Sequence, residues 1–193
     1  MAIPLDQVVV ALPTLIVVSG PPGSGKTTLA HAIARAVPCP AICRDEIKEG
    51  LLHAEAGAKP VWDGPVSERT LETFFGVLRL LLSARVTVVA EAAFQDKLWR
   101  AVLEPLLVLA DIRIVHCVVD PALARERIAR RLANKDASRA AHPDRELLEA
   151  LDSGKRSLES FEPISLFGPS LRVDTTDGYD PDLDHVIAFV NQR

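Results

Sequence analysis

One eight-residue stretch, GPPGSGKT at residues 20–27, constrains the fold of this chain more than any other feature. It matches the spacing G-x-x-x-x-G-K-[ST] and directly follows a continuous apolar run, TLIVVS at residues 14–19. Apolar residues at helical spacing come next, as far as Pro38, so the order is strand, loop, helix. A glycine-rich loop in this position directs backbone N–H groups and the positive end of a helix dipole at one point. The stretch therefore predicts a phosphate-binding site.

The remainder of the chain continues the alternation of strands and helices. Strands are expected at 41–43, 86–89 (ending in Ala90 and Glu91), 112–119 and 171–173, and helices at 45–52, from Ser67 onward, around Leu98–Leu106, at 122–133 and at 183–190. Ser67 is a candidate N-cap, and Pro105 is expected to break or kink its helix. Short buried strands alternating with helices specify a parallel α/β sheet. We expect a three-layer P-loop NTPase fold, with a five-stranded parallel sheet between two layers of helices.

Composition limits the partners that this fold could serve. The 193 residues are enough for one domain, 1–193, with its own hydrophobic core. A net charge of -4 and a pI near 5.7 disfavour a nucleic acid and favour a small substrate. Three cysteines without a disulfide framework indicate a reduced, cytoplasmic protein, and the apolar N-terminus lacks the positive region of a signal peptide. We expect no membrane segment, and the oligomeric state stays open.

The histidines and cysteines show no metal-binding array along the sequence. Cys39 and Cys43 lie four residues apart without a His or Cys at metal-ligand spacing, and His116 in a strand is expected to be a packed residue. The only metal ion that we expect is therefore the Mg²⁺ of a bound nucleotide.

The loop residues carry separate tasks in holding ATP. Lys26 is expected to bridge the β- and γ-phosphates, and the Thr27 hydroxyl to bind Mg²⁺. The full set expected to contact the nucleotide is Gly20, Pro21, Pro22, Gly23, Ser24, Gly25, Lys26, Thr27 and Thr28. A guanine-specifying N-K-x-D motif is absent from the sequence, which favours ATP over GTP.

Asp45 is the first candidate for acid–base chemistry. Ligands of parallel α/β sheets collect at the carboxyl ends of the strands, and Asp45 follows the predicted second strand. A carboxylate there could accept the proton of a hydroxyl that attacks the γ-phosphorus. Asp45 could instead be the N-cap of the next helix, and the two roles do not exclude each other.

The phosphate loop, together with CRDEIK at residues 43–48, resembles the small P-loop kinases grouped with polynucleotide 5′-hydroxyl kinase, zeta toxin and chloramphenicol phosphotransferase. The resemblance covers about residues 14–139 and the VDTT stretch at 173–176, and implies a nucleotide-kinase-like fold with Asp45 as general base. The AEA stretch at 90–92 is similar to the end of their third strand, which implicates Glu91 in positioning substrate or magnesium. Glu91 could otherwise be a solvated acid at a strand end.

Two arginines on the helix ALARERIARRLA are candidates for contacting phosphate. Arg127 and Arg131 lie four residues apart on one side of the helix, so they can reach toward one point. Their E-R-I-A-R-R pattern resembles the arginine-bearing helix of adenylate-kinase-like proteins, which implies stabilisation of the transferring phosphoryl and a lid-like segment at 127–145. A solvated helix face is the alternative, and Arg130 points away on this geometry.

Weaker signals lie in the polar stretches. Arg139, within the lid-like segment, is a further candidate, and Thr175 and Thr176 could border the base. Residues 48–68, which include Trp62, are expected to form a substrate-binding segment. None of these stretches identifies the acceptor molecule.

The sequence as a whole predicts an ATP-dependent kinase that transfers a phosphoryl group to a hydroxyl of a small molecule. Two other functions stay open: a regulatory nucleotide switch or ATPase, and a 5′-hydroxyl nucleic-acid kinase. The second fits the acidic net charge poorly.

Overall fold

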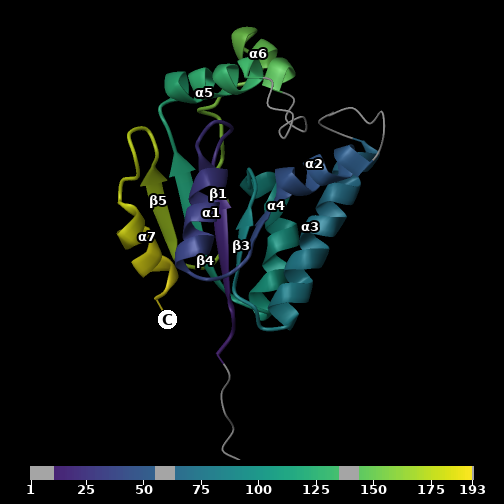
Figure 1. The fold of residues 1–193 in the computed structure, drawn as a ribbon, viewed down its shortest axis with the longest axis vertical. Coiled ribbons are helices and arrows are strands. Elements are labelled where there is room, and N and C mark those ends of the chain that lie inside the picture. Colours follow the sequence, from purple (N-terminus) through teal and green to yellow (C-terminus); the bar gives the residue numbers. More distant parts are fainter. Residues whose placement is uncertain (1–10, 55–63, 135–143, 193) are drawn as a thin grey trace, which may run out of the picture.

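The described part of the chain is built on a single parallel sheet (Figure 1). The computed structural model describes residues 11–54, 64–134 and 144–192. The strands are β1 (Thr14–Ser19), β2 (Ala41–Cys43), β3 (Val88–Glu91), β4 (Asp111–Val118) and β5 (Ser170–Asp174). They are ordered β2-β3-β1-β4-β5, and every neighbouring pair is parallel. The predicted five-stranded α/β fold is confirmed, with the strand before the phosphate loop at its centre.

Helices cover both faces of the sheet and its carboxyl end. They are α1 (Lys26–Ala36), α2 (Arg44–Ala54), α3 (Pro65–Ser83), α4 (Asp96–Leu103), the 3₁₀ helix η1 (Glu104–Val108), α5 (Pro121–Ala133), α6 (Asp144–Asp152) and α7 (Leu183–Val190). Figure 1 shows α3 and α4 on one side of the sheet, α7 on the other, and α5 with α6 beyond the tips of the strands. The helices at the tips therefore stand over the end of the sheet where ligands of such folds bind.

The alternation of side chains along β1 divides the core in two. Leu15 and Val17 pack against α3 and α4, in a cluster that contains Phe74 and Leu103. Ile16 and Val18 face the opposite way, toward α1 and α7. All four side chains are fully buried, as expected of an apolar strand interior that is covered on both faces.

Several boundaries differ from those predicted, and each difference has a local cause. Helix α3 begins at Pro65 after Gly64, so the prediction of Ser67 as its N-cap is wrong; proline suits the first helical position, and Ser67 is buried within the first turn. Strand β3 begins at Val88, after Thr87 accepts a hydrogen bond from the Thr14 amide. The break expected at Pro105 is confirmed, since α4 ends at Leu103 and η1 follows.

The sequence pattern did not reveal α6, an amphipathic helix that packs against α5. Among the described residues, no helix combines the length and the apolar character needed to cross a bilayer. Arg139 and Trp62 lie outside the described residues, as do residues 135–143 of the expected lid-like segment and residues 55–63 of the expected substrate-binding segment.

Candidate active site

The phosphate loop adopts a backbone that its glycines make accessible. Gly23 and Gly25 have φ values of 79° and 72°, in the left-handed region. A Cβ atom at Gly23 would lie 2.6 Å from the carbonyl oxygen of Ala124 on α5. A Cβ atom at Gly20 would lie 2.5 Å from the Cys117 carbonyl on β4. The glycines therefore allow both the turn and the close approach of the loop to its neighbours.

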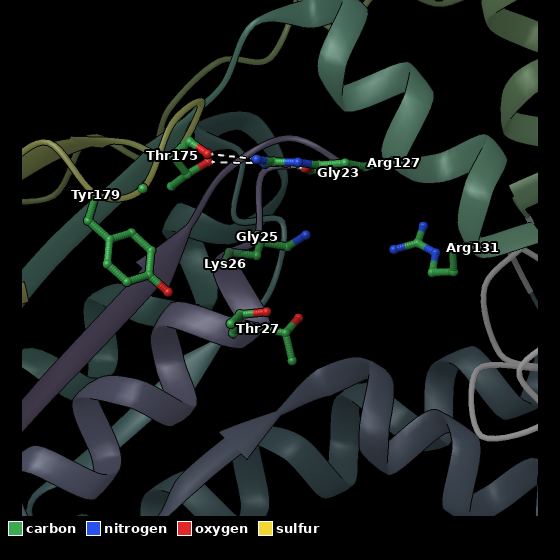
Figure 2. A pocket seen from close by; sticks show the side chains of 10 residues that line it. Gly23, Gly25, Lys26, Thr27, Arg127, Arg131, Thr175 and Tyr179 are labelled. Carbon is green, nitrogen blue, oxygen red and sulfur yellow. Dashed lines mark hydrogen bonds between the residues drawn. The ribbon is translucent and has the colours of Figure 1, made fainter. Parts of the chain in front are cut away.

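A cavity of about 410 Å³ opens beside this loop. Its walls are Gly23, Gly25, Lys26, Thr27, Thr28, Arg127, Arg131, Thr175, Gly178 and Tyr179 (Figure 2). Of the nine predicted nucleotide-contact positions, four do not line it: Gly20, Pro21, Pro22 and Ser24. Gly20 and Ser24 instead lie on the inner side of the loop, where a Cβ atom at Gly20 would contact Cys117 and Ser24. The Ser24 hydroxyl is buried and has no hydrogen-bond partner among the described residues.

Lys26 and Thr27 meet a carboxylate from the neighbouring strand. The Thr27 hydroxyl donates a 3.1 Å hydrogen bond to Oε2 of Glu91, and Nζ of Lys26 lies 3.8 Å from Oε1. Glu91 is the last residue of β3, directly beside Val18 of β1 in the sheet. The pairing of these two strands thus brings the acid to the start of α1.

Glu91 is buried, with 2% of its surface exposed, so the alternative of a solvated strand-end acid is wrong. Burial raises the pKa of Glu91 above its ordinary range; Lys26 opposes that shift, and Asp45 adds to it. The hydroxyl of Thr27 and the carboxylate of Glu91 are hard oxygen donors of the kind that Mg²⁺ takes. Their side-by-side placement fits the magnesium ion that was expected at Thr27.

Asp45 lies just past β2, near this acid but outside the cavity wall. Helix α2 begins one residue earlier, at Arg44, so Asp45 occupies its first turn and the alternative of an N-cap is wrong. The Asp45 carboxylate accepts a 2.9 Å hydrogen bond from Arg44, whose guanidinium stands over the Trp99 ring at 5.9 Å. Its charge also acts on Glu91, which places the two carboxylates in one electrostatic site.

The two predicted arginines line the cavity together. Arg127 donates hydrogen bonds to the carbonyl oxygens of Gly23, at 3.3 Å, and Thr175, at 2.8 Å. Arg131 forms two hydrogen bonds with the carboxylate of Asp144 on α6. Arg130, by contrast, is mostly exposed and pairs only weakly with Glu126 at 3.4 Å, as its predicted direction requires. Arg127 and Arg131 are therefore oriented by other residues before any ligand binds.

Three parts of the site escaped the sequence analysis. Tyr179 and Gly178 line the cavity. Figure 2 shows Tyr179 on the side of Lys26 and Thr27 that is away from Arg131. Asp144, buried beside Arg131, is the third. The Gly178 turn after the last predicted strand was the one available signal, because loops at the carboxyl ends of strands carry binding residues.

The hydroxyl of Thr175 ties the last strand to the phosphate loop. It donates a 2.8 Å hydrogen bond to the Ser24 carbonyl and is buried. Thr176 lies further out, where its carbonyl accepts from Arg127 at 3.4 Å. The expectation that both threonines border a bound base stays a prediction.

The fold matches solved structures of kinases. A proposed kinase from Chloroflexus aurantiacus is 26% identical, with a TM-score of 0.79 over 94% of this chain and 98% of that one. APS kinase from Mycobacterium tuberculosis, solved with AMPPNP and APS, is 16% identical, with a TM-score of 0.63 over 95% and 100% of the two chains. A gluconokinase from Sinorhizobium meliloti is 22% identical, with a TM-score of 0.54 over 94% and 91%.

Comparison at the level of sequence gives the family. No curated protein matches the chain significantly. A family described as an AAA domain, AAA_33, matches residues 15–158, which run from β1 through the phosphate loop, both acids and both arginines to the segment after α6. This chain therefore belongs to the AAA_33 family of AAA domains and has the fold of the small P-loop kinases.

Proposed function

We propose that this protein is a phosphotransferase that moves the γ-phosphoryl group of ATP to a hydroxyl of a small molecule. The observation that carries the proposal is the convergence of Lys26, Arg127 and Arg131 on one cavity of about 410 Å³ beside the phosphate loop. Three cations around one cavity suit a polyphosphate, and the kinase structures that share the fold support a transfer reaction.

The cations have a defined task in this reaction. As the bond between the γ-phosphorus and its bridging oxygen to the β-phosphate breaks, negative charge grows on the oxygens around it. Lys26 and Arg127 offset that charge from the loop and from α5, already held in position by Glu91 and Thr175. Thr27 and Glu91 would hold Mg²⁺, which screens the phosphate oxygens when bound.

Asp45 is the proposed general base. The acceptor oxygen forms a bond to the γ-phosphorus, and its proton passes to the Asp45 carboxylate while ADP departs. Support comes from the place of Asp45 at the carboxyl end of β2, in the electrostatic neighbourhood of Glu91. The ion pair with Arg44 restrains the carboxylate, so it can orient a hydroxyl as well as accept its proton.

A small acceptor fits the charge of the protein better than a nucleic acid. The net charge is -4, which opposes a polyanion at long range. The names gluconokinase and APS kinase also refer to small molecules, and those proteins share this fold. The site gives no comparable support to a regulatory switch or to a 5′-hydroxyl nucleic-acid kinase.

The test is transfer of labelled γ-phosphate from Mg·ATP to a panel of nucleosides, sugars, aminoglycosides, chloramphenicol-like drugs and a 5′-hydroxyl oligonucleotide. We expect one class of small molecule to be labelled by the wild-type protein. Asp45→Asn should keep ATP binding and lower transfer by about 10²- to 10⁴-fold, the range for loss of a general base. Glu72→Gln, an exposed acid on α3, is the matched control and should transfer normally.

Three results would overturn the proposal. Normal transfer by Lys26→Ala would remove the assigned role of the phosphate loop. Labelling of the oligonucleotide alone would replace the small acceptor with a nucleic acid, and steady hydrolysis of ATP with no labelled acceptor would favour the regulatory ATPase.

A further inference from the structure

A second group of side chains that could bind a metal ion consists of His31, Cys43 and Glu46. His31 comes from α1, Cys43 is the last residue of β2, and Glu46 lies in the first turn of α2. Their potential ligand atoms, one nitrogen, one sulfur and one oxygen, all lie within 4.8 Å of one another. None of the three lines the nucleotide cavity. Since the residues are 12 and 3 positions apart in sequence, no linear spacing motif could have revealed them.

We propose that His31, Cys43 and Glu46 form a binding site for a zinc ion, with water or a second carboxylate oxygen as the fourth ligand. The chemistry of the donors points to this metal. A thiolate excludes Mg²⁺ and Ca²⁺, which take oxygen ligands, whereas Zn²⁺ accepts sulfur, imidazole nitrogen and carboxylate oxygen together. Three protein ligands with an open fourth position are an established arrangement for zinc.

The separations of the donor atoms support a tetrahedral site. Zinc bonds of about 2.3 Å to sulfur and 2.0–2.1 Å to nitrogen imply a sulfur–nitrogen separation of about 3.6 Å at a tetrahedral angle. The Sγ atom of Cys43 lies 3.7 Å from Nε2 of His31. His31 and Glu46 are in direct contact at 2.7 Å and would separate by roughly 0.7 Å to share an ion. Both side chains are more than one-third exposed, so this adjustment needs only small rotations.

The burial and charge of the three residues suit an ion that enters from solvent. His31 and Glu46 are open to water, while the Cys43 thiol forms the floor of the site and is in no disulfide. Burial, and then the negative charges of Glu91 and Glu46, raise the pKa of Cys43. The same negative charges attract a cation. When the zinc–sulfur bond forms, the thiol proton is released to solvent and the imidazole binds through its neutral Nε2.

An ion at this site would have a structural effect. It would join α1, the helix after the phosphate loop, to the junction of β2 and α2, where Asp45 stands between Cys43 and Glu46. Because the unfolded chain does not hold the three ligands together, the ion stabilises the folded state by mass action. A rise in melting temperature with zinc concentration is therefore expected, without nucleotide or acceptor.

The test is calorimetric titration of Zn²⁺ into the full-length protein after treatment with a chelator, followed by titration with Co²⁺. We expect one Zn²⁺ per chain, release of a proton, and a thiolate-to-cobalt charge-transfer band with Co²⁺. His31→Ala and Glu46→Gln should each weaken Zn²⁺ binding at least about tenfold, because even the loss of outer-shell partners costs 10–100-fold. Cys43→Ser should abolish the cobalt band.

Controls separate a specific site from adventitious binding. Cys39→Ser removes a half-buried thiol outside the cluster and should leave the affinity and the cobalt band unchanged. His31→Ala and Glu46→Gln alter exposed side chains, so the metal-free variants should melt near the wild type even if Cys43→Ser unfolds. The proposal would be overturned if His31→Ala and Glu46→Gln both kept the wild-type affinity for Zn²⁺, or if the wild-type protein bound no Zn²⁺.

Discussion

The Thr27 hydroxyl is hydrogen-bonded to the buried carboxylate of Glu91, across 64 residues of sequence, at 3.1 Å. This contact joins the start of α1 to the end of β3, at the point where Lys26 also approaches the same carboxylate. Burial of an acid is costly unless other groups stabilise its charge. A hydroxyl and an ammonium group are in place to do so, which makes the pair a pre-arranged set of donors beside the phosphate loop.

Removing the charge of Glu91 should change the response to magnesium. We expect Glu91→Gln, which keeps the side-chain shape, to raise the Mg²⁺ concentration needed for half-maximal phosphoryl transfer by about 10- to 100-fold. The measurement is the transfer rate against Mg²⁺ at saturating ATP. Glu104→Gln, at an exposed residue that pairs with Arg100, should leave the curve unchanged. An unaltered Mg²⁺ curve in Glu91→Gln would limit Glu91 to a structural role.

Arg127 and Arg130 form a matched pair for testing the cationic wall of the cavity. Arg127→Ala should lower the turnover number by about 10²- to 10³-fold, because a preorganised cation beside the transferred phosphoryl is lost. Arg130→Ala, three residues further along the same helix and mostly exposed, should have little effect. Steady-state kinetics of both variants at saturating Mg·ATP would check this. Equal losses in the two variants would point to a general effect of charge on α5.

Gly23 should be much less tolerant of a methyl group than Gly76. Gly23→Ala would strain a left-handed residue and press its Cβ against the Ala124 carbonyl, so we expect a loss of about 1–3 kcal/mol of stability together with weaker ATP binding. Gly76→Ala, in the exposed middle of α3 with open space around it, should gain about 0.5–1 kcal/mol. Urea denaturation of the two variants measures both values. A neutral Gly23→Ala would mean that the loop can move away from α5.

The burial of His116 should make the stability depend on pH. His116 lines an apolar cavity of about 240 Å³ with Phe161 and Glu159, and burial lowers the pKa of its imidazole below the ordinary 6.5. As the pH falls through 6.5, the unfolded chain gains a proton that the folded chain does not, so stability decreases until the folded-state pKa is reached.

His116→Phe should remove this part of the pH dependence. Urea denaturation at about pH 7.5 and about pH 5 would measure the free energy of unfolding of each protein. The wild type should lose more stability on acidification than the variant does. An equal loss in both proteins would show that other groups, such as the exposed His185–Asp182 pair, account for the pH dependence.

Much of the fold could be predicted because it depends on local patterns. The apolar strands and the break at Pro105 correspond to the observed elements within one or two residues. Ser67 misled the prediction because serine is a good N-cap in general, while Pro65 and Gly64 were the stronger local signal. Helix α6 was not anticipated, since a short amphipathic helix owes its stability to packing against α5.

The sequence by itself determined the phosphate loop, because eight consecutive residues carry the glycines, the lysine and the hydroxyl that bind phosphate. Tertiary structure alone decided how the remaining groups surround it. Strand pairing brings Glu91 to Thr27, and packing of α5 brings Arg127 to within 3.3 Å of a residue 104 positions away. It also gathers His31, Cys43 and Glu46 from three elements. Contacts of this kind depend on sheet order and helix packing, which a linear spacing does not encode.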